Sequence, residues 1–314
     1  MDRLVLIDGN ALVHRAYHAY PPFTDSDNNP VGGVYGFFSM LLKILQDMQP
    51  HHLVVCFDSE GATFRQQLYV AYHAHRPQLS DDFVPQLIAI QEMLRDAGIC
   101  TFAVSGYEAD DLIGTIAHQT VQKQQEVEVI IVSGDRDLLQ LVNSHVRVLM
   151  PIVGITNMTI FDEQKVLEKY GVTPQQFIDY KALIGDVSDG YPGVTGIGPK
   201  GAANLIAKFG TFENLYKNLG EVPQGVSQKL ANDAEQATLA KKLATIVTDA
   251  PIHLKFKDTD IKNLKKEVLL KTFRKLGFQS LTKRWEDSSE KNSVQQSTGK
   301  KKVSKVSQQL GLLE

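Results

Sequence analysis

The sequence predicts an α/β protein in which a mostly parallel sheet is flanked by helices and followed by a smaller helical region. Three apolar runs rich in β-branched residues, at 4–7, 53–57 and 129–132, have the composition of buried parallel strands. Helix-like stretches such as 34–48 and 84–97 separate these runs. Strands that alternate with helices are typical of a doubly wound parallel sheet.

Length and composition bound the class of protein. The chain has 314 residues, of which 43% are hydrophobic and 22% charged, so we expect a substantial core and two compact parts. No run reaches the roughly 18 apolar residues of a membrane span, and the N-terminus enters a strand without a signal-peptide pattern. We therefore expect a cytoplasmic protein without membrane contact. Cys56 and Cys100 lie in apolar runs and are expected to be reduced thiols.

Three carboxylates are concentrated between an expected strand at 99–104 and a helix-like run. Glu108 and Asp111 are spaced i, i+3 and share one face of a helix, with Asp110 beside them. Acids in the first turn of a helix also complement its dipole, which would explain a single acidic pair. Like charges roughly 4 Å apart at a partly buried site repel by about 4 kcal/mol, so three acids favour a bound cation.

Four further acids end apolar strand-like runs, and two more follow the helical stretch 174–184. Ligands of open parallel sheets bind at the carboxyl ends of the strands, so these acids can converge. All-oxygen ligands suit Mg²⁺ or Mn²⁺, whereas Zn²⁺ favours His and Cys. The acids outnumber what one octahedral ion can use, so we expect two metals roughly 3.5–4 Å apart, as in phosphodiester hydrolysis. The predicted metal ligands are Asp8, Asp58, Glu108, Asp110, Asp111, Asp135, Asp137, Asp186 and Asp189.

Two segments have the composition of a nucleic-acid surface. Residues 61–82 interleave aromatic and basic side chains with few core-forming residues, and stacking surfaces with cations suit single-stranded nucleic acid. An exposed amphipathic helix is the alternative. The helix-like stretch after Asp8 carries His14, Arg15, Tyr17 and His18, which either reach a substrate phosphate or form a solvated face.

The segment 196–201 matches the dinucleotide fingerprint G-x-G-x-x-G, but no strand precedes it, so we reject NAD binding. A turn-rich segment precedes it instead, and Pro199 opens a helix with one apolar face. These features predict a helix-hairpin-helix, which presents turn amides and a helix N-terminus to a DNA phosphate without reading bases. A plain helical hairpin is the alternative.

The C-terminal part is basic. Residues 255–284 contain ten Lys or Arg against three Asp or Glu, at helical spacing, which indicates either a backbone-binding surface or a solvated helix face. Beyond Trp285 apolar residues thin out, and we expect a flexible tail.

Together these motifs resemble the bacterial 5′-nuclease, or flap-endonuclease, family over about residues 1 to 285. In that family the same motifs form the N-terminal domain of DNA polymerase I or a short stand-alone exonuclease, and the chain is similar in length to the latter. The matching strings are Asp8-Gly, Phe57-Asp58, Phe64-Arg65, Ser105 to Asp111, Ser133 to Asp137, Gly185 to Asp189 and Gly193 to Lys200.

The resemblance implies a PIN-like nuclease domain over 1–185 with a helical arch at about 61–82. It implies a helical DNA-binding region with a helix-hairpin-helix over 186–285, and leaves 286–314 as the tail. The implied activity is that of a structure-specific 5′-3′ exonuclease and 5′-flap endonuclease, a metal-dependent hydrolase of replication and repair. The implied partners are DNA with 5′ flaps, nicks or 5′ ends, and RNA primers, met by a monomer in the bacterial nucleoid.

The resemblance also assigns roles to residues. It places Asp8, Asp58, Glu108, Asp110 and Asp111 on one metal side, and Asp135, Asp137, Asp186 and Asp189 on the other. The arch admits a 5′ single strand past Arg65 and Tyr69, and positions matching Arg15, Tyr72 and Arg76 contact substrate near the cut. Duplex DNA is held at Gly196, Gly198 and Lys200, often with a K⁺ ion.

Two positions depart from the family pattern. His73 stands where a Lys usually follows the arch Tyr, and Gly190 stands where an Asn usually follows the last Asp. His73 lacks a fixed positive charge, and we expect it to be a partial phosphate contact in its charged form. A catalytically weak or inactive flap-DNA-binding scaffold is therefore the alternative function, and a related acid-cluster ribonuclease is a third. The expected hairpin argues against the ribonuclease because it binds duplex DNA.

The last residues regain apolar character after the polar tail. The peptide resembles the short segment by which bacterial replication proteins dock on the sliding clamp, although an aromatic residue is more usual at its last apolar position. Apolar residues isolated at a chain end without a role are the alternative. The predicted clamp contacts are Gln309, Leu310, Leu312 and Leu313.

Overall fold

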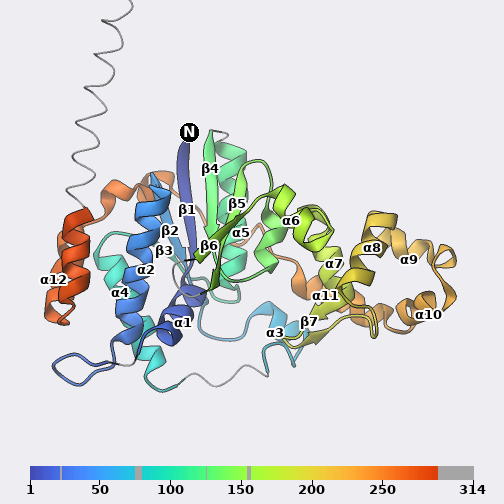
Figure 1. Ribbon diagram of the computed structural model, residues 1–314, viewed down its shortest axis with the longest axis horizontal. Helices are drawn as coiled ribbons and strands as arrows, with labels where there is room; N and C mark the ends of the chain where they lie inside the picture. The colour runs from blue at the N-terminus through green and yellow to red at the C-terminus, as the bar shows by residue number, and fades with distance from the viewer. Residues whose placement is uncertain (22, 75–79, 125, 154–156, 289–314) are drawn as a thin grey trace, which may run out of the picture.

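A six-stranded sheet organises the computed structural model, which describes residues 1–21, 23–74, 80–124, 126–153 and 157–288 (Figure 1). The strand order is β3-β2-β1-β4-β5-β6, and only β6 runs antiparallel to its neighbour. The mostly parallel sheet predicted from the sequence is thereby confirmed. Its strands are β1 (Asp2–Asp8), β2 (His52–Cys56), β3 (Cys100–Phe102), β4 (Val127–Val132), β5 (Val146–Val153) and β6 (Asn157–Phe161).

The central strand β1 explains why the apolar runs are continuous rather than alternating. Leu4 and Leu6 belong to the core on one face of the sheet, and Val5 and Ile7 to the core on the other. Parallel strands covered on both faces must be apolar at every position, as these are.

Helices cover both faces (Figure 1). The core with Val5 and Ile7 includes α1 (Gly9–Ala19), α2 (Gly32–Met48), α4 (Phe83–Asp96) and α12 (Lys266–Lys275). The opposite core includes α5 (Ala109–Lys123), α6 (Glu163–Tyr170) and α7 (Phe177–Ile184). Within the described chain no helix combines the length and the apolar character needed to cross a bilayer. Cys56 and Cys100 are both free thiols, as expected.

The helical region extends from the end of α7. A two-stranded antiparallel pair, β7 (Gly185–Asp186) and β8 (Tyr191–Pro192), leads to α8 (Pro199–Phe209). Three helices follow, namely α9 (Phe212–Lys217), α10 (Gln224–Asn232) and α11 (Ala234–Ala244). The short elements of the chain are α3 (Phe64–Leu68) and the 3-10 turns η1 (Asp137–Leu141), η2 (Pro174–Gln176), η3 (Leu219–Glu221), η4 (Phe256–Thr259) and η5 (Ile261–Asn263).

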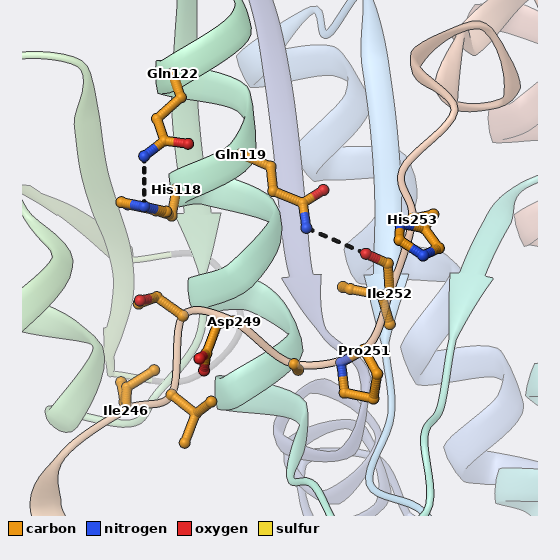
Figure 2. A pocket seen from close by; sticks show the side chains of 11 residues that line it. His118, Gln119, Gln122, Ile246, Asp249, Pro251, Ile252 and His253 are labelled. Atoms are coloured by element: carbon orange, nitrogen blue, oxygen red, sulfur yellow. Dashed lines mark hydrogen bonds between the residues drawn. The ribbon is translucent and has the colours of Figure 1, made fainter.

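After α11 the chain returns along α5, and Figure 2 shows this contact. Gln119 Nε2 donates to Ile252 O at 3.1 Å, and the Ala250 N–H donates to Thr115 Oγ1 at 3.0 Å. Residues 246–253 are therefore fastened along the helix whose first turn carries the acidic cluster.

The C-terminal helices do not belong to the helical DNA-binding region, in contrast to the expected domain boundary at 285. Leu270 and Phe273 of α12, with Leu281 and Trp285 of the helical residues 279–288, are buried in the core that contains α2. The helix continues through residue 288, so the tail does not begin at 286 as expected. The apolar residues within the basic stretch 255–284 therefore pack against the α/β domain.

This packing yields a stability prediction. Trp285 is 1% exposed, and we expect Trp285→Ala to lower the free energy of unfolding by about 3–5 kcal/mol, because it empties a large core site. Urea unfolding followed by circular dichroism measures the effect. Lys271→Ala, on the exposed side of α12, is the matched control and should change little. Equal stability of the two variants would contradict the packing.

Candidate active site

The acidic side chains meet where parallel strands end. Asp8 closes β1 and caps α1, since the Ala11 N–H donates to its Oδ1 at 2.9 Å. Ser133, after β4, donates its hydroxyl to Asp8 Oδ2 at 2.7 Å. Asp58, after β2, accepts the Ala109 N–H of α5 at 2.8 Å. Each acid is thus positioned by backbone or hydroxyl donors of a neighbouring element.

Asp110, in the first turn of α5, is the electrostatic centre of the group. Burial, followed by the charges of Asp135, Asp8 and Asp58, raises its pKa well above the usual range. Burial also raises the pKa of Asp8 to about 7, with a contribution from Asp58. Burial and the Asp135 charge raise the pKa of Asp137 to about 7. The protein alone does not neutralise this cluster, which is the condition that a bound cation relieves.

Most of the predicted ligands share one cleft of about 1390 Å³. Its lining also includes Arg15, Tyr72 and His73, so the cleft joins α1, the base of the arch and the strand ends. Asp111 and Asp186 do not line it. The predicted acids that do are Asp8, Asp58, Glu108, Asp110, Asp135, Asp137 and Asp189.

The donor set fits a hard divalent cation. Among the described residues no three Asp, Glu, His or Cys side chains form a ready-made cage for one ion. Mg²⁺ retains several waters and takes only one or two carboxylates from a protein, so an open ring of acids is compatible with it. A closed site of the kind that holds structural Zn²⁺ is not present in that part of the chain.

Arg65 and Asp111 form a buried pair. Arg65 is 2% exposed and Asp111 is fully buried, and the guanidinium donates to both Asp111 oxygens at 2.8 Å. It also donates to Glu108 at 3.0 Å and to the carbonyls of Leu243 and Thr245. Burial alone would lower the pKa of Arg65, but Asp111 and Glu108 outweigh it and raise the pKa.

These contacts correct two predictions. Arg65 is not placed to contact DNA, because its donors are directed into the protein. Asp111 is not placed to ligate metal, because its oxygens are taken by Arg65 and by the Val247 N–H at 2.9 Å. The pair fastens α3, at the start of the arch, to α5 and to the end of α11.

Lys181 is a site residue that the sequence analysis missed. Its ammonium lies 2.6 Å from Asp137 Oδ1 and also contacts Asp186. Burial lowers its pKa, but the two carboxylates outweigh burial and raise it. Lys181 in turn lowers the pKa of Asp186, although burial acts in the opposite direction. The sequence signal that could have revealed this site residue was a lysine within the apolar helix 177–184.

The arch residues lie close to the acids. Tyr72 is 5% exposed and donates its hydroxyl to Glu108 at 3.2 Å, while Tyr69 packs partly buried beside it. His73 Nε2 lies 3.1 Å from Asp189 Oδ1, and both residues line the cleft. Arg15 donates to Pro151 O at 3.3 Å, and burial lowers its pKa. Arg76 lies outside the described residues.

The hairpin turn precedes α8 as predicted. The buried side chain of Ile197 anchors the turn to the core, whereas Gly196, Gly198 and Lys200 are exposed and available to a ligand. Lys229 Nζ donates to Gly196 O at 3.2 Å, so an ammonium already lies against one carbonyl of this turn. Two-residue β8 and the turn precede α8 in place of a buried parallel strand, which agrees with the rejection of NAD binding.

Comparison with known families agrees with this geometry. Residues 3–171 match a family described as 5′-3′ exonuclease, N-terminal resolvase-like domain. Residues 172–267 match a family described as 5′-3′ exonuclease, C-terminal SAM fold. The chain belongs to the 5′-3′ exonuclease family. The resemblance inferred from the motifs is thereby confirmed.

Two curated relatives illustrate the range of this exonuclease family. The chain is 37% identical over 283 residues to a 5′-3′ exonuclease of Aquifex aeolicus, covering 90% of this chain and 95% of the relative. It is 40% identical over 288 residues to DNA polymerase I of Bacillus caldotenax, covering 91% of this chain. The match spans only 33% of that polymerase, about a third of its length.

Solved structures share the fold. A bacteriophage T5 flap endonuclease in a pseudo-enzyme-product complex with DNA and metal ions superimposes with a TM-score of 0.64 at 21% identity. The alignment covers 92% of this chain and 98% of that one. A T5 protein co-crystallised with metal ions gives 0.63 at 20% identity, with 92% and 98% covered. Identities this low support the PIN-like arrangement of the exonuclease fold and no more.

The departure at Gly190 has a simple conformational account. Its φ is +79°, in the left-handed region. Glycine adopts that region freely and asparagine adopts it more readily than most residues. Either residue therefore permits the backbone turn that follows Asp189.

The buried ion pair yields a prediction that separates structure from DNA contact. We expect Arg65→Ala to lower the free energy of unfolding by about 3–5 kcal/mol, because it leaves the Asp111 charge buried without compensation. Combining Arg65→Met with Asp111→Leu should recover part of that loss. Denaturant unfolding of the three proteins tests this. Wild-type stability with weakened DNA binding would instead restore Arg65 as a DNA contact.

The raised pKa values of Asp8 and Asp137, each about 7, predict a pH dependence. Unfolded Asp titrates near about pH 4, so between about pH 4 and pH 7 the folded state binds more protons. Stability of metal-free protein should therefore fall as pH rises through this window.

Melting temperatures in EDTA between pH 5 and 8 measure the fall. Millimolar Mg²⁺ should reverse it at the upper end, because the ion binds the ionised folded cluster. Asp8→Asn should raise the metal-free melting temperature at pH 8, and Asp96→Asn, an exposed acid, is the control. A flat profile in EDTA would refute the account.

Proposed function

We propose that this protein is a structure-specific 5′-3′ exonuclease and 5′-flap endonuclease that hydrolyses DNA phosphodiesters in replication and repair. The observation that carries the proposal is the convergence of Asp8, Asp110 and Asp135 on one cleft that also holds Arg15 and the base of the arch. Family membership as a 5′-3′ exonuclease supports it. Because the curated polymerase relatives extend far beyond the matched region, no polymerase activity is part of the proposal.

Two Mg²⁺ or Mn²⁺ ions complete the proposed site. Bound there, divalent ions supply neutralisation of phosphate charge and an activated water for in-line attack. Asp8, Asp58, Asp110 and Asp135 are the residues to hold them, since the charges of the other three all raise the pKa of Asp110. Lys181 keeps Asp137 and Asp186 ordered beside them.

The protein's own groups position the DNA. Arg15 in the cleft is placed to pair with a phosphate near the cut, with Arg76 as a second cation supplied by the arch. The exposed amides of the turn at Gly196 and Gly198 and the Lys200 ammonium would hold the duplex backbone without base readout. A K⁺ ion at this turn would share its carbonyls with Lys229, which already contacts Gly196 O.

An inactive scaffold and a ribonuclease are the competing functions. If the protein were only a scaffold, its acidic side chains would have no reason to remain buried with raised pKa values, because a buried carboxylate without a neutralising partner costs stability. A 5′-flap DNA and the same strand as RNA, each incubated with Mg²⁺ and with EDTA, separate the three. Metal-dependent flap cleavage supports the proposal, binding without cleavage supports the scaffold, and RNA-only cleavage supports the ribonuclease.

Loss of one central acid should separate chemistry from binding. We expect Asp110→Ala or Asp135→Ala to reduce cleavage of a 5′ flap by at least about a thousandfold while flap affinity stays within a few-fold, because the hairpin and arch supply much of the binding. Single-turnover cleavage and fluorescence anisotropy give the two readouts, with Asp96→Ala as the control. Turnover by Asp135→Ala at the wild-type rate would sink the two-metal assignment.

The sliding-clamp peptide stays a prediction, because residues 308–314 lie outside those that the structure describes. Docking through it would raise the effective concentration of the nuclease at replicated DNA without altering the active site. Deleting 308–314 should abolish clamp affinity and leave cleavage without clamp unchanged. Absence of clamp binding by the full-length chain at about tens of micromolar would end the idea.

A further inference from the structure

His73 is held against Asp189 by two separate contacts. Its Nε2 lies 3.1 Å from Asp189 Oδ1, and its backbone N–H donates to Asp189 O at 2.9 Å. The Tyr72 ring stacks on the imidazole at a centroid distance of 3.8 Å and an angle of 27°. Both side chains are largely buried, at 15% and 9% exposed. The imidazole is thus fixed in one position at the base of the arch.

The backbone of His73 supports a specific role for this side chain. Its φ is +60°, in the left-handed region that few residues other than glycine adopt. Histidine is one of the side chains enriched there, and such conformations cluster at functional sites. The cost of this conformation is offset by the contacts to Asp189, so the residue and its carboxylate partner form one unit.

The two polar atoms hydrogen bond to each other, and their separation also suits two ligands of one ion. Two ligand atoms at adjacent corners of an octahedral ion, each bonded at about 2.1 Å, lie about 3.0 Å apart. The measured separation of Nε2 and Oδ1 is 3.1 Å. Asp189 also adds to the charge that raises the pKa values of Asp135 and Asp137, which places the pair at the edge of the acid cluster.

We propose that His73 Nε2 and Asp189 Oδ1 together ligate one divalent ion of the active site, and that this nitrogen ligand biases the enzyme toward Mn²⁺ over Mg²⁺. This assignment rests on the proposed function and replaces the expected phosphate contact of His73. Mn²⁺ and Mg²⁺ both suit carboxylate ligands, but Mn²⁺ belongs to the transition-metal series that accepts nitrogen ligands, whereas Mg²⁺ is a hard ion that takes oxygen. A lysine carries three donors and no acceptor, so the usual family residue could not serve as a ligand.

The competing account is that the His73–Asp189 pair is a structural latch, meaning a pair that holds the base of the arch in place and binds no metal. A His73–Asp189 pair would then only fasten the base of the arch, and any side chain that donates to Asp189 would replace it. His73→Gln retains a donor for Asp189 but has no imidazole nitrogen, and His73→Lys retains an ion pair. These two variants therefore preserve a latch and remove the proposed ligand.

The direct test is electron spin-echo spectroscopy of the full-length protein loaded with Mn²⁺, in which a directly bound imidazole gives a ¹⁴N coupling. We expect the coupling in the wild type and in His14→Gln, which removes a different histidine of the same cleft, and its loss in His73→Gln and His73→Lys. Titration calorimetry should show the Mn²⁺ to Mg²⁺ affinity ratio falling about tenfold in both His73 variants. Circular dichroism and melting temperature check that each variant is folded, and Asp189→Asn offers a second route to loss of the chelate.

The outcomes distinguish this assignment from the proposed function. A wild type that cleaves flap DNA but shows no ¹⁴N coupling, or a coupling that persists in His73→Gln, overturns the chelate and leaves the nuclease intact. A coupling that depends on His73 in a protein that cleaves no flap with Mn²⁺ or Mg²⁺ supports the chelate and overturns the nuclease. An unchanged affinity ratio in both His73 variants overturns the proposed metal bias.

Discussion

Mutual repulsion among buried carboxylates is the constraint on which this structure depends. The protein resolves it in two ways according to position. At the outer edge, internal cations pair with the acids: Arg65 contacts Asp111 and Glu108, and Lys181 contacts Asp137 and Asp186. At the centre, the pKa values of Asp8 and Asp110 are raised, and Asp8 accepts a backbone and a hydroxyl hydrogen bond instead of pairing with a cation. A site whose central acids lack internal cations, beside acids that are paired with Arg65 and Lys181, is prepared for mobile cations.

The sheet supplies the geometry that this electrostatic arrangement needs. Asp8 and Cys56 are register partners at the ends of β1 and β2, so Asp58 and Asp8 leave neighbouring strands almost side by side. Ile7 pairs with Val132 of β4, which brings Ser133 and then Asp135 to the same edge. Placement of the acids therefore follows from strand register. The register is fixed because a one-residue slip would exchange the side chains that each strand packs into the two cores.

The sequence predicted those parts of the site that depend on local pattern. Asp8, Asp58 and Asp135 were found because each follows an apolar run, and strand ends converge in any parallel sheet. Partnerships across the chain were not predictable in this way. No local sequence pattern indicates that Arg65 contacts Asp111 and the carbonyl of Leu243, or that Trp285 packs in the core with α2. Aromatic and basic composition near 65–76 fits both a DNA surface and a buried anchor, and burial alone decides between them.

One helix, α7, connects the acidic cluster to the proposed duplex anchor. Lys181 on this helix pairs with Asp137, while Asp179, two residues earlier, accepts the Phe212 N–H at 2.9 Å and pairs with Lys241 at 2.7 Å. At its C-terminal end the Val194 N–H donates to Leu183 O at 2.8 Å, and a Cβ at Gly193 would lie 2.3 Å from that carbonyl. Only glycine permits this approach, so the hairpin turn is fastened directly to α7. Any displacement of the turn is therefore opposed by the same helix that orders Asp137 and Asp186, and a duplex held at Gly196 and Gly198 keeps a fixed reach to the acids.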